Sequence, residues 1–315
     1  MAERLPRERR PPTHPRRIPP SVRCMTVTLP PAARLDDRTV VVTGASSGIG
    51  RAAARELARR GATVAVVGRN PDRTRTVAHE IGGTAYLADF SDLSTVRELA
   101  DQLLAENPRI HVLANNAGAT IPERALTVDG HETTFQGNHL APFLLTALLT
   151  PRLLETAKEA PAGSVRIVQT SSAGNLFGKV DLDDLDNARG AWAGGFRAYG
   201  TSKLLNVLFT RELARRLPRA GGGVDAFAFH PGFVASGFGG DGAFMTAAKR
   251  LAVSTEDGAE PLIRLAGAAT VPAPSGNYFD RLKAPGRVAR QAADADLARR
   301  LWDESARLLD LDETI

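Results

Sequence analysis

Short apolar runs alternate with longer amphipathic stretches along most of the chain, from residue 38 onward. An apolar run without polar alternation indicates a strand buried on both faces, and helices between such strands make the sheet parallel. Strands are expected at 39–44, 62–69, 84–89, 110–118, 164–172 and 224–232, and helices at 49–61, 71–82, 91–107, 131–158, 198–217 and 289–309. The alternation predicts an α/β fold, with a doubly wound parallel sheet between two layers of helices and residues 276–280 as an edge strand.

The 315 residues are expected to form one folded domain, because a doubly wound α/β unit can reach this length. This domain is predicted over residues 36–315. Residues 1–35 precede the first expected strand and are rich in arginine and proline, so they are predicted to be a disordered extension. Met25 is an alternative start of the protein, because the domain pattern begins soon after it.

The net charge of +5 lies entirely in this extension. Residues 1–24 hold seven arginines and two glutamates, whereas the rest of the chain holds 33 Lys or Arg and 33 Asp or Glu side chains. A neutral domain argues against nucleic acid as a partner. The extension lacks the apolar segment of a secretory signal, and its prolines and glutamates argue against the alternative of an organelle transit peptide.

Several classes of site are not expected. No apolar run reaches the roughly 18–20 residues that a membrane-spanning helix needs, so no span is predicted. The single cysteine, Cys24, lies in the extension, which fits a reducing cytoplasm as the predicted location. The histidines lack the i, i+4 pairing of a helical zinc site, and the acidic stretch 181–187 lacks the glycine of a calcium loop, so no metal is predicted.

The segment VVTGASSGIGR, residues 41–51, joins the first expected strand to the first expected helix. Gly44 allows a sharp turn there, and Gly48 and Gly50 let the backbone approach a ligand closely. A helix N-terminus in this position binds phosphate through its unpaired backbone N–H groups. The context predicts a dinucleotide site, whereas the glycines alone would also fit a tight structural turn.

The end of the second expected strand indicates which dinucleotide is bound. An acidic residue there would hold the free ribose hydroxyl of NAD, but the sequence reads Gly68-Arg69-Asn70. Arg69 can meet a 2′-phosphate, and Arg51 on the glycine loop adds a second cation. NADP(H) is therefore predicted in preference to NAD(H). The alternative is that both arginines are solvated surface residues.

Tyr199 and Lys203 form a candidate acid–base pair. They are four residues apart on the helix expected at 198–217, so they share one face. A tyrosine with a pKa of about 10 is a weak acid–base catalyst at neutral pH, and a nearby ammonium lowers that pKa. The same spacing also occurs on helices without catalytic function, so the pair depends on the motifs around it.

With these motifs the chain resembles the short-chain dehydrogenase/reductase family, over about residues 35–310. The motifs that occur in the family's order and spacing are Thr43-Gly44-Ala45-Ser46-Ser47-Gly48-Ile49-Gly50, Asn115-Asn116-Ala117-Gly118, Ser171-Ser172, Tyr199-x3-Lys203 and Pro231-Gly232. The segments NHLAPFLLT (138–146), HPG (230–232) and GNYF (276–279) are similar to the branch of retinol-dehydrogenase-like and WW-domain-oxidoreductase-like enzymes. The resemblance implies a Rossmann-type fold.

The resemblance also implies roles for individual residues. Tyr199 would exchange a proton with the substrate oxygen, and Ser172 would hydrogen-bond that oxygen, so both would bind substrate. Lys203 would bind the nicotinamide ribose and lower the pKa of Tyr199, and Asn138 would hold a water that links Lys203 to solvent. Cofactor contacts are expected from Gly44, Ser46, Ser47, Gly48, Ile49, Gly50, Arg51, Arg69, Asp89, Phe90, Asn116, Ala117, Gly118, Tyr199, Lys203, Pro231, Gly232, Val234 and Ser236.

The chain departs from the family pattern at a few positions. Phe90 stands where leucine often follows the adenine-contacting acid, and Gly137 stands where a β-branched residue is common. The gap between Ser172 and Tyr199 is longer than in compact members of the family. Ser171 is a rival to its neighbour Ser172 for the serine role.

Two segments are candidates for the substrate pocket. Trp192 and Phe196 lie before Tyr199 and either line a substrate mouth or pack locally. Residues 237–260 begin with the glycine-rich stretch GFGGDGAFMTAAKR, which predicts a mobile lid over an apolar substrate.

The sequence therefore predicts an NADP(H)-dependent oxidoreductase that transfers a hydride between nicotinamide and a carbonyl or alcohol, with lipophilic ketones and aldehydes as expected substrates. The alternative is a non-catalytic NADP(H)-binding regulatory or scaffold protein with the same fold. The glycine spacing argues against an epimerase or dehydratase. A small molecule is the expected partner, and the resemblance implies a homodimer or homotetramer, often formed through the helix that carries Tyr199.

Overall fold

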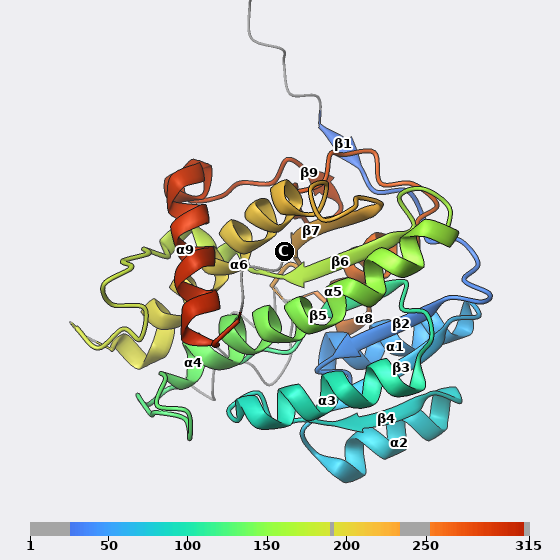
Figure 1. The fold of residues 1–315 in the computed structure, drawn as a ribbon, viewed down its shortest axis with the longest axis horizontal. Coiled ribbons are helices and arrows are strands. Elements are labelled where there is room, and N and C mark those ends of the chain that lie inside the picture. Colours follow the sequence, from blue (N-terminus) through green and yellow to red (C-terminus); the bar gives the residue numbers. More distant parts are fainter. Residues whose placement is uncertain (1–25, 190–191, 234–252, 312–315) are drawn as a thin grey trace, which may run out of the picture.

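The computed structural model describes residues 26–189, 192–233 and 253–311. Strands in these residues form one sheet in the order β1-β9-β8-β7-β6-β5-β2-β3-β4 (Figure 1). Their bounds are β1 Val27–Thr28, β2 Thr39–Thr43, β3 Thr63–Gly68, β4 Thr84–Leu87, β5 Val112–Asn115, β6 Val165–Thr170, β7 Val224–His230, β8 Tyr278–Asp280 and β9 Lys283–Ala284. All neighbours from β4 to β8 pair in parallel, which confirms the predicted doubly wound α/β sheet.

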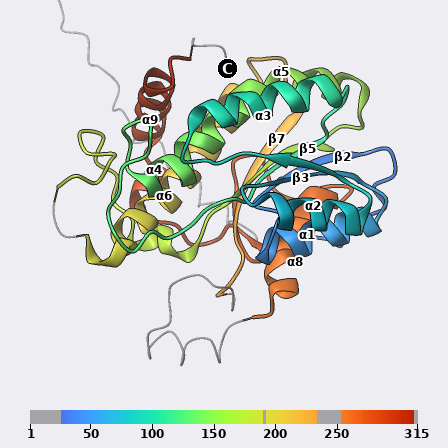
Figure 2. The same ribbon diagram turned by 90° about the horizontal axis from the view of Figure 1, so that it is seen from below.

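Helices cover both faces of this sheet and make three layers (Figure 2). One layer holds α1 Gly48–Arg59, α2 Pro71–Ile81 and α8 Thr255–Gly267; the other holds α3 Leu93–Glu106, α5 Ala141–Glu159, α6 Phe196–Arg216 and α9 Ala295–Leu308. Successive side chains of a strand point to opposite faces. Val40 and Val42 accordingly pack in the core under α1 and α8, and Val41 packs in the core under α3, α5 and α6.

The segment expected as one helix over residues 131–158 is divided in the structure. It begins with the short α4, Thr133–Phe135, continues as a π-helical turn over Gln136–Leu140, and then becomes α5. A π turn inserts one extra residue into a helical turn and is often found at functional sites. Asn138 lies in the middle of this turn.

Residues 26–35 pack on the domain, so the prediction that the disordered extension reaches residue 35 is wrong. Leu29 and Leu35 are almost fully buried. The short β1 pairs antiparallel with β9, and the Leu29 N–H donates to the carbonyl of Leu282 at 2.8 Å. Two-residue strands carry too little pattern to be predicted from sequence.

The C-terminal third adds elements that the sequence did not predict. The strand expected over 276–280 is present as β8, but it is not at the edge, because β9 and β1 lie beyond it. Helix α8 packs against α1. Of the predicted lid, residues 237–252 lie outside the described residues, and the part from Thr255 onward is the first turn of α8.

Helix α6 is enclosed on nearly all sides within the chain. Its residues from 200 to 210 are all buried, and α9 packs along it (Figure 1). Trp302 of α9 stacks on Phe209 of α6 with ring centroids 5.6 Å apart and also contacts Phe143 of α5. The helix expected to form a dimer face is therefore covered by α9 of the same chain.

In the part of the chain that the structure describes, no helix is both long and apolar enough to cross a membrane.

Candidate active site

The predicted site residues gather at one edge of the sheet, where the parallel strands have their carboxyl ends. Gly44 follows β2, Arg69 follows β3 and Asp89 lies two residues beyond β4. Asn116 follows β5, Ser171 and Ser172 follow β6, and Pro231 follows β7. The strand order reverses between β5 and β2, and ligands of doubly wound folds bind at such a switch point.

The glycine loop has the geometry that close approach to a ligand requires. Gly44 and Gly48 have φ angles of +65° and +53°, a region that favours glycine. A Cβ on Gly50 would lie 2.4 Å from the carbonyl oxygen of Gly44, so no side chain fits there. Helix α1 begins at Gly48, and the preceding Ser47 makes no side-chain cap. The first backbone N–H groups of α1 therefore do not donate to the side chain of Ser47.

A second loop lies against the glycine loop. The hydroxyl of Thr43 accepts hydrogen bonds from the backbone N–H groups of Asn116 and Ala117, each at 3.0 Å. The Asn116 amide in turn donates to the Thr43 carbonyl at 3.0 Å. These bonds hold the Asn116–Gly118 segment beside β2, and its contact with the adenosine ribose stays a prediction.

Arg69 and Asp89 lie together at the ends of β3 and β4. The guanidinium nitrogen Nη1 of Arg69 is 3.9 Å from Oδ1 of Asp89, and the Arg69 side chain is 76 % exposed. Asp89 also accepts hydrogen bonds from the backbone and hydroxyl of Ser91. Arg51 is exposed on the first turn of α1. Arg69 and Arg51 are thus both exposed cations, and no acidic residue stands at the end of β3.

Tyr199 and Lys203 share one face of α6, as their spacing predicted. The ammonium nitrogen Nζ of Lys203 lies 5.4 Å from the centroid of the Tyr199 ring and donates to the carbonyl of Thr170 at 3.1 Å. Ser172 caps a 3₁₀ turn, and its hydroxyl accepts from the Gly174 N–H at 3.1 Å. The structure therefore brings Ser172, Tyr199 and Lys203 together.

Burial shifts the pKa values of Tyr199 and Lys203 in the directions that favour the neutral form of each side chain. It lowers the pKa of Lys203 to about 8, so the amine remains mostly charged at pH 7. It raises the pKa of Tyr199, and a hydrogen bond with Ser172 opposes this rise. The net direction for Tyr199 is upward, because loss of water around the phenol outweighs the hydrogen bond with Ser172, and the lowering of the Tyr199 pKa by Lys203 stays a prediction.

Ser171 cannot take the serine role, because its hydroxyl is used inside the protein. It donates to the backbone carbonyl of Lys203 at 2.7 Å, and the side chain is buried. Ser172 is the member of the pair that lies beside Tyr199.

Asn138 anchors the loop that contains Gly118. Its Oδ1 accepts from the Ala119 N–H, and its Nδ2 donates to the Ala119 carbonyl, both at 2.9 Å. Nδ2 also lies 3.0 Å from the Ser202 hydroxyl on α6. Asn138 thus joins the π turn, the Gly118 loop and the helix that carries Lys203. Motif spacing identified the residue, but no signal in the sequence predicted the π turn.

Pro231 and Gly232 follow β7 at the same edge, and Gly232 has a φ angle of +94°. The predicted contacts Val234 and Ser236 lie outside the described residues.

Comparison with known proteins agrees with this geometry. A profile of the short chain dehydrogenase family matches residues 38–182. A Streptomyces sp. (strain C5) protein named as a candidate daunorubicin C-13 ketoreductase, DnrU, is 42 % identical over 295 residues, which cover 90 % of this chain and 97 % of that protein. Mouse retinol dehydrogenase 12 is 40 % identical over 287 residues, covering 88 % of this chain and 87 % of that enzyme.

The chain is a member of the short-chain dehydrogenase family. It belongs to the retinol-dehydrogenase-like branch and is an oxidoreductase that acts on CH–OH groups or carbonyls. Among solved structures, an uncharacterised protein from Mycobacterium paratuberculosis is similar with a TM-score of 0.71 and 35 % identity, covering 89 % of this chain and 96 % of that one. A Burkholderia cenocepacia short chain dehydrogenase in complex with NADP is similar with a TM-score of 0.61 and 26 % identity, covering 78 % and 97 %.

The site of this short-chain dehydrogenase fits a nicotinamide dinucleotide. In the glycine loop, a Cβ on Gly44 or Gly50 would meet protein atoms at 2.9 Å or 2.4 Å, and a Cβ on Gly118 would lie 3.0 Å from Oδ1 of Asn138 and 3.2 Å from Nζ of Lys203. Glycine at these positions lets the glycine loop, the Asn116–Gly118 segment and Lys203 lie close together. A dinucleotide bound at this edge would run from Arg69 past Gly50 to Lys203.

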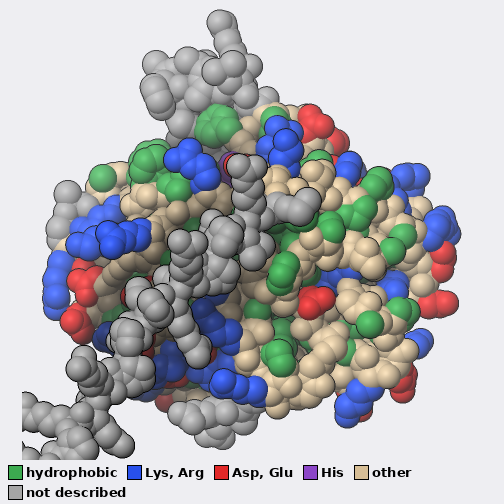
Figure 3. Space-filling view, turned by 90° about the horizontal axis from the view of Figure 1, so that it is seen from above, with side chains coloured by type: hydrophobic (Ala, Val, Ile, Leu, Met, Phe, Trp, Pro, Cys, Tyr) green, Lys and Arg blue, Asp and Glu red, His purple; other side chains and the backbone are tan. Residues whose placement is uncertain are grey.

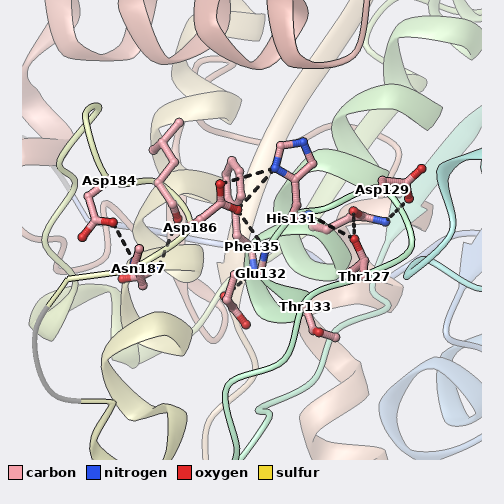
Figure 4. Close-up of polar contacts among 12 residues, drawn as sticks. Thr127, Asp129, His131, Glu132, Thr133, Phe135, Asp184, Asp186 and Asn187 are labelled. Atoms are coloured by element: carbon pink, nitrogen blue, oxygen red, sulfur yellow. Dashed lines mark hydrogen bonds and ion pairs between the residues drawn. The ribbon is translucent and has the colours of Figure 1, made fainter.

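The acidic loop 181–187 of the dehydrogenase is hydrogen-bonded to the start of α4, which precedes the π turn that contains Asn138 (Figure 4). Asp186 accepts from the Glu132 N–H at 2.8 Å and lies 3.3 Å from Nδ1 of His131. Glu132 caps α4 by accepting from the N–H groups of Thr134 and Phe135. Burial raises the pKa of Glu132, whereas the hydrogen bonds to His131 and to the Glu132 N–H hold the pKa of Asp186 below its usual value against the effect of its own burial. The sequence did not predict this link between the long segment that separates Ser172 from Tyr199 and the helical segment that contains Asn138.

On one face of the dehydrogenase, Lys and Arg side chains are interspersed with Asp and Glu and with hydrophobic side chains (Figure 3).

Proposed function

We propose that this short-chain dehydrogenase is an NADP(H)-dependent reductase of apolar ketones and aldehydes, with Tyr199 as the proton donor. The observation that carries the proposal is the convergence of Ser172, Tyr199 and Lys203 at the strand edge that also holds the glycine loop. A bound nicotinamide would supply the hydride. The residues of the chain then have to hold the carbonyl oxygen and neutralise the charge that develops on it.

Tyr199 is suited to act as an acid. Burial raises its pKa, so the phenol carries its proton at neutral pH and can donate it to the substrate oxygen. Ser172 lies beside Tyr199 and would hold the same oxygen. Lys203 remains mostly charged at pH 7 and would bind the hydroxyls of the nicotinamide ribose. We assign Asn138 to the support of this group, through its bonds to Ala119 and Ser202, and propose that it takes part in proton supply to Lys203.

The preference for NADP(H) rests on Arg69 and Arg51. Both are exposed, and the ion pair that Arg69 makes within the described residues is a long contact of 3.9 Å with Asp89, so Arg69 can turn toward a 2′-phosphate. No acidic residue stands at the end of β3 to bind the free hydroxyl of NAD. The relative solved with NADP supports the same choice.

We propose that exposed aromatic side chains close in sequence to the site residues form an apolar rim for a lipophilic substrate. Phe177, Phe196 and Phe233 are 86 %, 63 % and 48 % exposed. Each lies within five residues of a predicted site residue, Ser172, Tyr199 or Gly232. Exposed aromatic groups this close in sequence to the polar residues favour a bulky apolar carbonyl compound, and the relatives named for ketoreductase and retinol dehydrogenase activity support the same choice. Trp192 is tied to the Pro122 carbonyl at 2.8 Å and would shape this rim from the side.

The experiment is a screen of aldehydes, ketones and quinones for substrate-dependent oxidation of NADPH, repeated with NADH. We expect turnover of at least one apolar carbonyl, with a higher kcat/KM for NADPH than for NADH. Binding of NADPH without oxidation across the panel would instead indicate the regulatory or scaffold alternative.

A further inference from the structure

The loop that follows β4 is the part of the site expected to meet the adenine of the cofactor. It contains Asp89 and Phe90, and helix α3 begins soon after them at Leu93. One hold on this loop comes from α3 itself, where the Thr95 hydroxyl accepts from the Asp89 N–H at 3.0 Å. The other holds come from a segment that lies far along the chain.

Gln136 contacts this loop from the first position of the π turn. Its Nε2 donates to the Phe90 carbonyl at 3.3 Å and to Oδ2 of Asp129 at 2.7 Å. Its Oε1 accepts from the Thr127 hydroxyl at 2.6 Å, and the residue is 0 % exposed. The two N–H groups of this buried amide can therefore serve two acceptors, one of them on the loop.

Asp129 contacts the far end of the same loop. Its Oδ2 accepts from the backbone N–H of Leu93 at 3.0 Å as well as from Gln136. Leu93 is the first residue of α3, where backbone N–H groups have no partner within the helix. Figure 4 shows Asp129 near Thr127, on the turn that leads into α4. Gln136 and Asp129 together therefore fix the backbone of the loop from Phe90 to Leu93.

We propose that Gln136 and Asp129 are positioning residues for the adenine end of the cofactor site. They act on the cofactor through loop 89–92, whose backbone they hold. Gln136 belongs to the same π turn as Asn138, so one turn supports both ends of the dinucleotide site. The inference rests on the proposed function, in which NADP(H) binds with its adenine at this loop.

Titrations with NADPH and with adenosine 2′,5′-bisphosphate, its adenine half, test the proposal. Gln136→Met keeps the length of the side chain but removes the amide, and Asp129→Ala removes an exposed carboxylate. We expect each to raise both dissociation constants by about threefold to tenfold, the effect of losing about one hydrogen bond. The effect is modest because the glycine loop and Arg69 would still bind the phosphates. At saturating NADPH, kcat should change by less than about twofold, since the loop binds ground state and transition state alike.

Asp129→Asn is the rescue variant. Its amide oxygen can still accept from Gln136 and Leu93, so the Kd for NADPH should stay within about twofold of the wild-type value. Tighter binding by both Asp129 variants would instead reveal an effect of the negative charge on an anionic cofactor and would overturn the proposal. Because Gln136 and Asp129 share a hydrogen bond, the double variant Gln136→Met/Asp129→Ala should raise the Kd by less than the product of the single effects.

Asn107→Leu is the control for loss of a buried amide. Asn107 lies at the other end of α3, where its Nδ2 donates to the Leu103 carbonyl and to the Tyr86 hydroxyl. Its removal should lower the thermal stability but leave both dissociation constants unchanged. Wild-type affinities in Gln136→Met and Asp129→Ala, or an equal weakening in Asn107→Leu, would overturn the proposal. Asp129→Ala changes an exposed residue, so it decides the matter where Gln136→Met fails to fold.

Three results separate this inference from the proposed function. A wild type that binds neither NADPH nor NADH would overturn both. A wild type that binds NADPH but reduces no carbonyl would overturn the reductase proposal, and the dissociation constants of the variants would still decide the role of Gln136 and Asp129. A wild type that reduces a carbonyl, beside variants with unchanged affinity for NADPH, would overturn this inference alone.

Discussion

The two halves of the carboxyl edge of the sheet are built in different ways. At the ends of β2, β3 and β4, the site consists of backbone and exposed cations: Gly44 and Gly50, where a Cβ would meet protein atoms at 2.9 Å and 2.4 Å, and Arg69, which is 76 % exposed. At the ends of β5, β6 and β7, it consists of buried side chains: Lys203 and Asn206 both donate to the Thr170 carbonyl, and Asn138 donates to the Ser202 hydroxyl. The first half can bind an anion with little supporting structure. The second half depends on what packs behind it.

The largest expected effect is a loss of stability when packing behind the buried half of the site is removed. Trp302 of α9 packs between Phe143 and Phe209, so Trp302→Ala should destabilise the protein by about 3–5 kcal/mol. Chemical denaturation measures this. Arg299→Ala, which removes exposed ion pairs on the same helix, is the control and should change stability by less than about 0.5 kcal/mol. Equal effects of the two changes would contradict the view that α9 supports the catalytic half by packing.

The next effect concerns the backbone half. A Cβ on Gly50 would lie 2.4 Å from the Gly44 carbonyl oxygen, so Gly50→Ala should shift the loop at a cost of about 1–3 kcal/mol. NADPH titration should show a Kd at least several-fold higher. Gly137→Ala is the matched control, since nothing lies within 4 Å of its added methyl group. Similar NADPH affinities for the two variants would argue against close approach of the dinucleotide to the glycine loop.

A smaller effect separates NADPH from NADH. Arg69→Ala should raise the Kd for NADPH about tenfold, which is about 1.4 kcal/mol, because it removes a charged partner of the 2′-phosphate. The Kd for NADH should stay within about twofold, since NADH has no phosphate at this position. If both affinities fell equally, the assignment of Arg69 to the 2′-phosphate would be wrong.

The smallest expected effect is a gradual pH dependence. The pKa of Lys203 is about 8, so its charge is present below that pH and is lost as the pH rises through it. The pKa of Tyr199 is raised, so the phenol keeps its proton over the same range. The reduction rate should therefore fall above pH 8, and this fall should be absent from the residual rate of Lys203→Met. A wild-type rate that increases between pH 7 and 9 would contradict the roles given to both residues.

The difference between the two halves also explains which features of the site could be predicted from the sequence. Glycine φ angles and the i, i+4 spacing of Tyr199 and Lys203 are local properties, so the glycine loop and the acid–base pair could be predicted from spacing. Three other features depend on burial by segments that are distant in the sequence. They are the π turn at Asn138, the hydrogen bond from the Ser171 hydroxyl to the Lys203 carbonyl, and the rise in the pKa of Tyr199. The covering of α6 by α9 has the same origin. No local pattern contains that information.

The central claim is that Tyr199 protonates the substrate oxygen at a site that binds NADPH independently of it. The most direct test compares Tyr199→Phe with the wild type in two assays, NADPH titration and reduction of the best carbonyl found in the screen. We predict that kcat falls by about 10²–10⁴-fold, the usual contribution of general acid catalysis, while the Kd for NADPH changes by less than about threefold. A Tyr199→Phe enzyme that binds NADPH normally and still reduces the carbonyl at the wild-type rate would contradict the claim.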